Sequence, residues 1–174
     1  MNLQKLWSEK LEGRAWQVRE EFLELLQIMK SKNIKNVLEI GTYKGGTSFG
    51  FLSIGCKVFS IDIVKQPEIA ELEEQFKEDF RFALRADKTF LTPEFDMLFV
   101  DGNHRYEECR KDYEEFSPYI KKGGYIVFHD VIKSELHAQQ ECEVWKVWEE
   151  VKSKDNFQII YNGTWGGIGI MVKE

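Results

Sequence analysis

Short, nearly continuous runs of apolar residues recur along the chain and alternate with longer segments of helical periodicity. The runs lie at residues 37–40, 58–61, 80–84, 97–100 and 125–128. Strands buried on both faces of a parallel sheet have such nearly continuous apolar runs, whereas half-exposed strands alternate between apolar and polar residues. The pattern therefore predicts an α/β fold with a mostly parallel sheet.

Between these runs, apolar residues recur every three to four positions, as they do on one face of an amphipathic helix. Helices are predicted at residues 46–54, 68–77 and 107–120. Two leading helices are predicted within residues 2–30, with Gly13 as the break between them.

The C-terminal part differs from this alternation. A further helix is predicted at residues 144–151, followed by strands at 157–161 and 168–172 around a turn-rich connection. Adjacent strands joined by a short loop must pair antiparallel, because a parallel return needs a crossover of a dozen residues or more. The predicted fold is a Rossmann-like doubly wound sheet, mostly parallel, with seven strands and a C-terminal antiparallel hairpin.

One domain is expected for residues 1–174, with leading helices over 1–33 and a Rossmann-like core over 35–174. A chain of 174 residues with an apolar fraction of 43% is long enough for a sizeable core and short for two. No internal repeat or low-complexity linker divides the sequence.

The charge and the cysteines restrict the partners and the compartment. A formal net charge of −6 argues against a protein that mainly holds a nucleic-acid backbone, so no nucleic-acid partner is expected. No apolar stretch approaches the roughly 18 residues that a membrane span needs, and no signal-peptide pattern is visible. Cys56, Cys109 and Cys142 are widely spaced, which suits a reducing compartment, and we interpret them as small buried residues. A cytoplasmic protein without a membrane partner is predicted.

The most distinctive segment runs from Val37 to Gly46, where an apolar run contains an acid and then breaks into glycines. Gly41 and Gly45 permit close approach of a ligand to the backbone, and the helix that follows offers free N–H groups. Tyr43 occupies the second glycine position of the dinucleotide motif, which disfavours a pyrophosphate ligand. Glu39 suits a cofactor with a positive charge, such as the aminoacyl end of S-adenosylmethionine. The alternative is an ordinary strand-to-helix turn.

Two further acids follow the next two predicted strands. Asp62 closes the second strand about twenty residues after the turn, the spacing at which an acid hydrogen-bonds ribose hydroxyls. Asp87 ends the third strand and could lie near an adenine, although a helix N-cap is an equally good interpretation. The phasing of Glu39, Asp62 and Asp87 with three successive strand ends favours a nucleoside-containing cofactor.

The fourth and fifth strands also end in polar residues, Asp101 with His104 and His129 with Asp130. In a doubly wound sheet both ends open onto the crevice of the glycine turn, so these side chains should converge. The two carboxylates are ligands of the type that Mg²⁺ or Mn²⁺ prefers, and either histidine could be a general base or a ligand. The alternatives are helix capping by the acids and a buried, satisfied His129.

Three other residues are expected to have structural roles. Aromatic residues on an amphipathic stripe usually pack in the core or at an interface, so we expect this of Trp7 and Trp16 rather than ligand contact. His137 lies in a polar stretch and is expected to be a solvated loop residue, although that loop could cover the substrate.

Several of these segments together resemble the class I S-adenosylmethionine-dependent methyltransferases. The matching segments are Leu-Glu-Ile-Gly-Thr-Tyr-Lys-Gly-Gly-Thr-Ser at 38–48, Ser-Ile-Asp at 60–62 and Phe-Val-Asp-Gly-Asn-His-Arg-Tyr-Glu at 99–107. Asp112, Gly123-Gly124 and His129-Asp130-Val131 extend the resemblance to the small-molecule O-methyltransferase branch. It spans roughly Val37 to Val131, and the two later motifs are more specific than the glycine turn.

The resemblance implies roles for individual residues. The cofactor-binding residues would be Glu39, Gly41, Thr42, Gly45, Asp62, Ile63, Asp87 and Asp101. Glu39, Gly41 and Gly45 would line the methionine end of the cofactor. Asp62 would hold the ribose, and Asp87 would lie by the adenine. Asp101, His129 and Asp130 match positions that bind a divalent cation in metal-dependent relatives. Here His129 replaces a carboxylate, and imidazole is a poor Mg²⁺ ligand.

The sequence therefore predicts methyl transfer from S-adenosylmethionine to a hydroxyl of a small molecule, such as a sugar or a polyketide-like acceptor. His104 is the candidate base, with Asp101 beside it, and Mg²⁺ or Mn²⁺ is a candidate second cofactor. Three alternatives remain: an accessory protein of the hydroxylase-associated type, a nicotinamide-dependent oxidoreductase and a non-catalytic binding module. The expected partner is the small-molecule acceptor, and the helical N-terminus suggests a surface for a homo-oligomer.

Overall fold

The computed structural model describes residues 2–86 and 94–174, and within them it contains one seven-stranded sheet in the order β3-β2-β1-β4-β5-β7-β6. The strands are β1 (Asn36–Ile40), β2 (Lys57–Asp62), β3 (Phe80–Leu84), β4 (Phe95–Val100), β5 (Ile120–His129), β6 (Asn156–Ile159) and β7 (Ile168–Val172). Neighbours among the first five strands are parallel, whereas β7 is antiparallel to both β5 and β6. The predicted fold class and its C-terminal antiparallel strands are confirmed.

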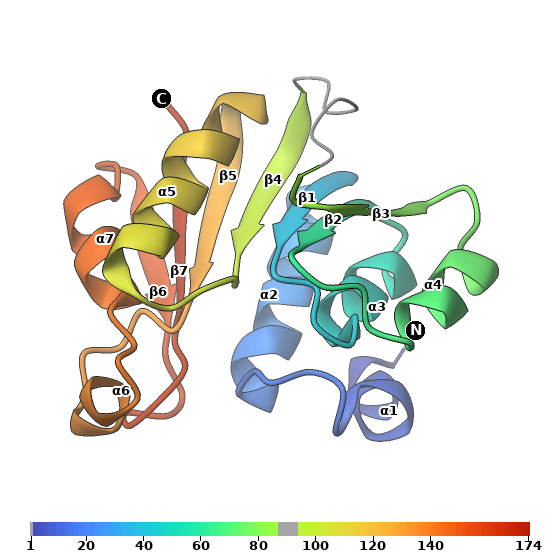
Figure 1. The fold of residues 1–174 in the computed structure, drawn as a ribbon, viewed down its shortest axis with the longest axis horizontal. Coiled ribbons are helices and arrows are strands. Elements are labelled where there is room, and N and C mark those ends of the chain that lie inside the picture. Colours follow the sequence, from blue (N-terminus) through green and yellow to red (C-terminus); the bar gives the residue numbers. More distant parts are fainter. Residues whose placement is uncertain (1, 87–93) are drawn as a thin grey trace.

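Helices cover both faces of this sheet (Figure 1). They are α1 (Leu3–Leu6) with the π-helical turn η1 (Trp7–Leu11), α2 (Arg19–Ser31), α3 (Gly46–Ser53), α4 (Ile69–Gln75), α5 (Tyr106–Phe116) with the 3₁₀ turn η3 (Ser117–Tyr119), α6 (Glu135–Gln139) and α7 (Val144–Val151). Helix α5 ends four residues before the predicted end at residue 120, because Pro118 cannot continue the hydrogen-bonding ladder. Strand β5 therefore begins earlier than the apolar run alone indicates.

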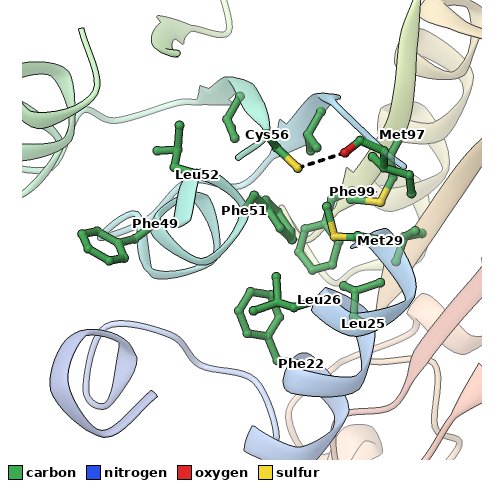
Figure 2. Packing of buried hydrophobic residues seen from close by; sticks show 14 of the residues in the cluster. Phe22, Leu25, Leu26, Met29, Phe49, Phe51, Leu52, Cys56, Met97 and Phe99 are labelled. Atoms are coloured by element: carbon green, nitrogen blue, oxygen red, sulfur yellow. Dashed lines mark hydrogen bonds between the residues drawn. The ribbon is translucent and has the colours of Figure 1, made fainter. Parts of the chain in front are cut away.

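Aromatic side chains fill the core on the face covered by α2 and α3. Phe51 lies between Phe22 and Phe99, with ring centroids 5.6 and 5.4 Å away. Figure 2 shows this stack beside Cys56, whose thiol donates a hydrogen bond to the Ile34 carbonyl. All three cysteines are buried and unpaired with one another, as the sequence predicted.

The opposite face is covered by α5 and α7. Phe128 of β5 packs on Trp148 of α7 with ring centroids 6.0 Å apart. Gly169 of β7 lies under the same indole, where a Cβ would come within 2.8 Å of ring atoms. The antiparallel end of the sheet is therefore shaped to take the tryptophan.

Buried residues of α1, η1 and α2 connect the N-terminal helices to the rest of the fold. Leu6, Trp7 and Leu11 are buried in the core, which confirms the expectation for Trp7. Glu21 of α2 is fully buried and accepts hydrogen bonds from the backbone N–H groups of Tyr161, at 2.8 Å, and Gly167, at 2.7 Å. Helix α2 thus fixes the connection between β6 and β7. None of the helices in the described residues is long and apolar enough to cross a membrane.

The strand order places the ends of β1 and β4 side by side, and the chain leaves them for opposite faces of the sheet. Such a switch point opens a crevice outside the carboxyl ends of the strands. The sequence-predicted polar residues lie at or just after the last positions of β1, β2, β4 and β5 at this edge.

Candidate active site

A cavity of about 670 Å³ opens at the carboxyl ends of β1, β2 and β4. Residues of the glycine turn, the ends of the three strands, the first part of α5 and the segment before α2 line it. Of the residues predicted from the sequence, Gly41, Thr42, Asp62, Ile63, Asp101 and His104 lie in its wall. A cavity of this size is typical of a small-molecule or cofactor site.

Gly41 fixes the geometry of the turn after β1. Its φ is +93°, and a Cβ there would lie 2.0 Å from the carbonyl oxygen of Asp101. The turn can therefore pass the end of β4 only with glycine at this position. Gly45, also with positive φ, is the N-cap of α3 and offers no side chain to its first N–H groups. These N–H groups have no intrahelical partner and favour a negatively charged group. Gly45 itself does not line the cavity.

Glu39 lies beneath the turn rather than in the cavity wall. Its side chain is fully buried and accepts hydrogen bonds from Thr47, from Ser48 and, at 2.6 Å, from Ser60. The carboxyl group ties α3 and β2 to β1 in this structure, and the predicted contact between Glu39 and the methionine end of a cofactor stays a prediction. Burial raises the pKa of Glu39 to about 7, although the three hydroxyl donors lower it.

We expect the native protein to lose stability as the pH rises from 4.5 to about 7. Glu39→Gln should not show this loss. Between its ordinary pKa of 4.5 and about 7, Glu39 keeps its proton when folded and loses it when unfolded. The unfolded state then binds fewer protons, so stability falls with pH across this interval and stays constant above it. The shift corresponds to on the order of 3 kcal/mol.

Urea unfolding of both proteins at pH 4.5 and pH 8 measures this difference. Glu74→Gln, which removes an exposed acid of α4, is the matched control and should behave as the native protein does. An equal fall in stability for Glu39→Gln and the native protein would contradict the assignment.

Asp62 joins the end of β2 to the glycine turn. Its Oδ2 accepts a hydrogen bond from the Tyr43 backbone N–H at 2.8 Å, and its Oδ1 accepts one from the Ile63 N–H at 2.6 Å. The carboxylate lines the cavity next to the exposed Ile63 side chain. Since a carboxylate has about four acceptor positions, it can still bind hydroxyl groups of a ligand. Asp87, the predicted adenine contact, lies outside the described residues.

The structure brings the polar residues after β4 and β5 into one cluster. Asp101 Oδ1 lies 3.1 Å from His129 Nδ1 and 3.4 Å from His104 Nε2. Asp130 Oδ2 lies 3.3 Å from His104 Nε2 and 3.4 Å from His129 Nδ1. The ligand atoms of all four side chains lie within 4.8 Å of one another, an arrangement that could hold a metal ion. Of the four, Asp101 and His104 face the cavity, while His129 and Asp130 lie behind them.

The cluster stabilises the charged forms of its members. Burial by itself would lower the pKa of His129, but Asp101 and Asp130 hold it well above the usual value. Burial acts in the same direction on His104, and Asp101 and Asp130 again raise its pKa. Burial would raise the pKa of Asp130, whereas the neighbouring His129 holds it below the usual range. A proton on either imidazole is therefore stabilised.

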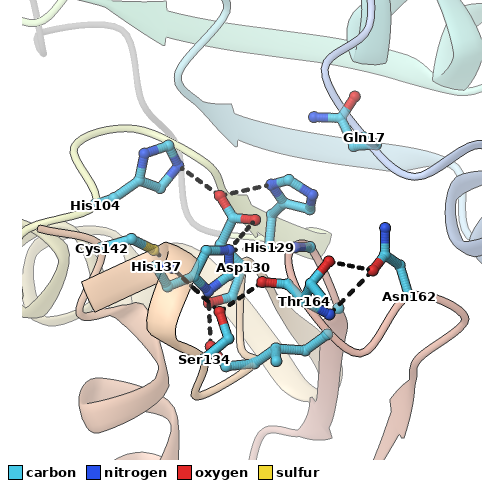
Figure 3. A network of polar contacts seen from close by, with 12 residues as sticks. Gln17, His104, His129, Asp130, Ser134, His137, Cys142, Asn162 and Thr164 are labelled. Carbon is cyan, nitrogen blue, oxygen red and sulfur yellow. Dashed lines mark hydrogen bonds and ion pairs between the residues drawn. The ribbon is translucent and has the colours of Figure 1, made fainter. Parts of the chain in front are cut away.

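His137 also belongs to this network, and the prediction of a solvated loop residue is wrong. It is 2% exposed, and Figure 3 shows it beside Asp130, with Nε2 at 3.4 Å from the carboxylate. Its Nδ1 donates to the Ile132 carbonyl at 2.7 Å. The side chain of Ser134 caps α6, and this short helix turns His137 inward from a stretch that is otherwise polar.

The segment before α2 forms one wall of the cavity, which the sequence did not indicate. Gln17 Nε2 donates to Asp101 Oδ2 at 2.7 Å. Trp16 is 70% exposed and packs edge-on against Tyr43 of the glycine turn, with centroids 6.0 Å apart. Both line the cavity, so Trp16 does not pack in the core, and the alternative expectation that it packs at an interface stays a prediction. Residues 14–17 show no motif or periodicity that marks a site.

A second wall that the sequence did not predict comes from the end of β3 and from α5. Arg85 forms ion pairs with Asp112 and, at 3.0 Å, with Glu115. Arg85 and Asp112 line the cavity. Asp112 belongs to the segments that resemble the methyltransferases, but the resemblance implies no role for it.

Two curated relatives match most of the chain. A protein of Acanthamoeba polyphaga mimivirus described as uncharacterised is 28% identical over 144 residues, covering 72% of this chain and 65% of its own length. A protein of Sinorhizobium fredii, also described as uncharacterised, is 26% identical over 139 residues, covering 67% of this chain and 15% of its own length. The chain thus spans less than two thirds of both relatives.

Solved structures share the fold. A Staphylococcus aureus protein assigned as a caffeoyl-CoA O-methyltransferase has a TM-score of 0.74 at 19% identity, covering 100% of this chain and 93% of that one. An O-methyltransferase of Bacillus cereus with bound S-adenosylhomocysteine has a TM-score of 0.71 at 14% identity, covering 98% and 88%. The N-methyltransferase NodS of Bradyrhizobium japonicum, also with S-adenosylhomocysteine, has a TM-score of 0.68 at 17% identity, covering 98% and 96%.

A family model described as a methyltransferase domain matches residues 38–131, from the strand before the glycine turn to the residue after Asp130. The match covers more than half of the chain and includes the glycine turn, the end of β2 and the whole Asp101 to His104 segment. The chain therefore belongs to the methyltransferase-domain family.

Proposed function

We propose that this protein transfers a methyl group from S-adenosylmethionine to a hydroxyl group of a small molecule, such as a sugar or a polyketide-like acceptor. The observation that carries the proposal is the position of His104, in the wall of the same cavity as the glycine turn and within hydrogen-bonding range of Asp101. Two of the structural neighbours described above are O-methyltransferases, which supports a hydroxyl acceptor.

The residues around the cavity fit this cofactor. Gly41 leaves room for the Asp101 carbonyl, which brings the glycine turn and the end of β4 together in the cavity wall. Asp62 lines the cavity and can accept from ribose hydroxyls. When bound, the sulfonium of S-adenosylmethionine makes its methyl group electrophilic, so the protein mainly has to align the acceptor and remove a proton.

His104 is the proposed general base. Because Nε2 faces two carboxylates that can only accept, the neutral ring carries its proton there and Nδ1 can take the proton of an acceptor hydroxyl; Asp101 and Asp130 then stabilise the imidazolium that results. The same two carboxylates raise the pKa of His104 against the effect of burial, which strengthens it as a base. Its position at the cavity, unlike that of the buried His129, leaves it open to an acceptor.

Asp101, His129 and Asp130 are the proposed ligands of a divalent cation. Together with His104 they offer a mixture of imidazole and carboxylate donors within 4.8 Å; the carboxylates suit Mg²⁺ or Mn²⁺, whereas imidazole is a poor ligand for Mg²⁺. Such an ion would lower the pKa of the acceptor hydroxyl and fix its orientation.

Calorimetric titration with S-adenosylmethionine, with and without Mg²⁺ or Mn²⁺, tests the cofactor assignment. Asp62→Ala should weaken binding by about tenfold or more, since a hydrogen bond to a charged group contributes about 1.5–3 kcal/mol. Glu78→Ala, which removes an exposed acid before β3, should bind as the native protein does. No binding by a folded native protein would contradict the proposed function.

Methyl transfer from isotope-labelled S-adenosylmethionine to a panel of hydroxylated compounds and their matched amines tests the acceptor class. We expect the hydroxyl compounds to acquire the labelled methyl group and the matched amines to acquire little of it. Label only in the amines would contradict the hydroxyl assignment while leaving methyl transfer intact.

A further inference from the structure

The segment formed by Arg14, Ala15, Trp16 and Gln17 crosses the start of α3 and closes one side of the cavity. A Cβ on Gly46, the first residue of α3, would lie 2.5 Å from the Ala15 backbone nitrogen. The segment is therefore pressed against the helix end that follows the glycine turn. Two of its side chains contain buried polar atoms that have no hydrogen-bond partner among the described residues.

Gln17 carries an unused hydrogen-bond acceptor. Its side chain is 6% exposed, and its Nε2 donates to Asp101 Oδ2 at 2.7 Å. Because a carboxylate can only accept here, the amide nitrogen must face Asp101, which fixes the opposite orientation for Oε1. That oxygen is buried and has no hydrogen-bond partner within the described part of the chain. It stands ready to accept from a ligand beside a carboxylate.

Arg14 carries unused donors. Its Nε and Nη2 atoms are buried and make no hydrogen bond to any described residue. Glu71 of α4 approaches Nη2 only to 3.5 Å, and its side chain is 71% exposed, so solvent screens that ion pair. The guanidinium lies 5.9 Å from the Phe49 ring of α3. A charged group with unmet donors stands at the edge of the cavity.

The two side chains have complementary polarity. A buried donor or acceptor left without a partner is destabilising, so such atoms in a cavity wall indicate a ligand that completes them. Here Arg14 supplies a cation with free donors. Three residues later, Gln17 supplies a carbonyl oxygen beside the Asp101 carboxylate. An amino-acid zwitterion, which has a carboxylate and an ammonium group on one carbon, offers a partner to each of these two side chains.

We propose that residues 14–17 bind the amino-acid end of the cofactor. Arg14 pairs with the α-carboxylate, and Gln17 Oε1 together with Asp101 accepts hydrogen bonds from the α-ammonium group. This inference rests on the proposed function, because it takes S-adenosylmethionine as the ligand. It adds two specificity-determining residues that come from outside the sheet and its strand ends.

The test compares two ligands that differ in the amino-acid end. S-adenosylhomocysteine carries it, and 5′-methylthioadenosine lacks it; both are titrated by calorimetry into the native protein and into Arg14→Leu and Gln17→Leu. Each variant should bind S-adenosylhomocysteine about 10- to 100-fold more weakly, and 5′-methylthioadenosine within twofold of the native protein. Arg14→Lys, which keeps the charge, should recover part of the loss.

Matched controls are Arg81→Leu and Gln158→Leu, which remove the same side chains from exposed positions on β3 and β6. They should leave both affinities unchanged. Equal losses for the two ligands would assign the segment a purely structural role and overturn the inference, as would an unchanged affinity of Gln17→Leu for S-adenosylhomocysteine. If the native protein binds 5′-methylthioadenosine but gains nothing from the amino-acid end, the inference fails alone. If it binds neither ligand, the proposed function fails with it.

Discussion

Replacing His104 with alanine should lower turnover by about 10²- to 10⁴-fold, the usual contribution of a positioned general base. The variant keeps the glycine turn, Asp62 and the cavity wall before α2. Its affinity for S-adenosylhomocysteine should therefore stay within about twofold of the native value, in keeping with a loss confined to proton transfer. Turnover is measured on the acceptor that the labelled-methyl assay identifies.

The pH profile separates a lost base from a disturbed structure. Because Asp101 and Asp130 outweigh burial and raise the pKa of His104, the neutral imidazole predominates only above its ordinary value of 6.5. Native turnover should then rise with pH through that raised pKa, and the residual turnover of the variant should lack this rise. Near-normal turnover in His104→Ala, or an unchanged pH profile, would rule out the assignment.

Replacing Gly41 with alanine should destabilise the protein by more than about 4 kcal/mol, a loss of the size that follows only from severe strain or a serious packing defect. The added Cβ would lie 2.0 Å from the Asp101 carbonyl oxygen, and a backbone atom at the end of β4 cannot move aside as a flexible side chain can. The residue must also keep a φ of +93°. Urea unfolding measures the change, and S-adenosylhomocysteine binding by the folded fraction should weaken with it.

Gly55→Ala is the matched control for this change. Gly55 has a φ of +87°, but no atom of the described residues lies within 4 Å of the position that its Cβ would take. Alanine there should cost only the left-handed conformation, about 1–2 kcal/mol. Equal losses for the two variants would show that backbone strain alone, and not the contact with the end of β4, determines the need for glycine at position 41.

The elements that the sequence predicted well are those whose signals are local. The apolar runs at β1, β2 and β4 locate the buried strands, and acids at their ends mark the edge at which a parallel sheet opens. The short link between β6 and β7 dictates an antiparallel pair. Local pattern is therefore sufficient to place Asp62, Asp101 and His104 at the crevice.

The remaining features depend on contacts between distant residues. Gln17 meets Asp101 across 84 positions, and nothing near residue 17 signals that contact. The inward turn of His137 depends on Asp130 and Ile132 rather than on its polar neighbours. The sequence placed Glu39 correctly near the end of its strand. It could not show the three hydroxyl groups that donate hydrogen bonds to this carboxyl group beneath the turn.

The bonds made by Glu21 have a consequence for the order in which the protein is made. Its partner Tyr161 lies 140 residues later, and a ribosome that adds about 5–20 residues per second needs roughly 7–30 s to reach it. Until then α2 has a carboxylate in water that the finished protein buries. Helix α2, which directly follows this cavity wall, is therefore among the earliest segments synthesised, whereas its bonds to the connection between β6 and β7 are among the last to form.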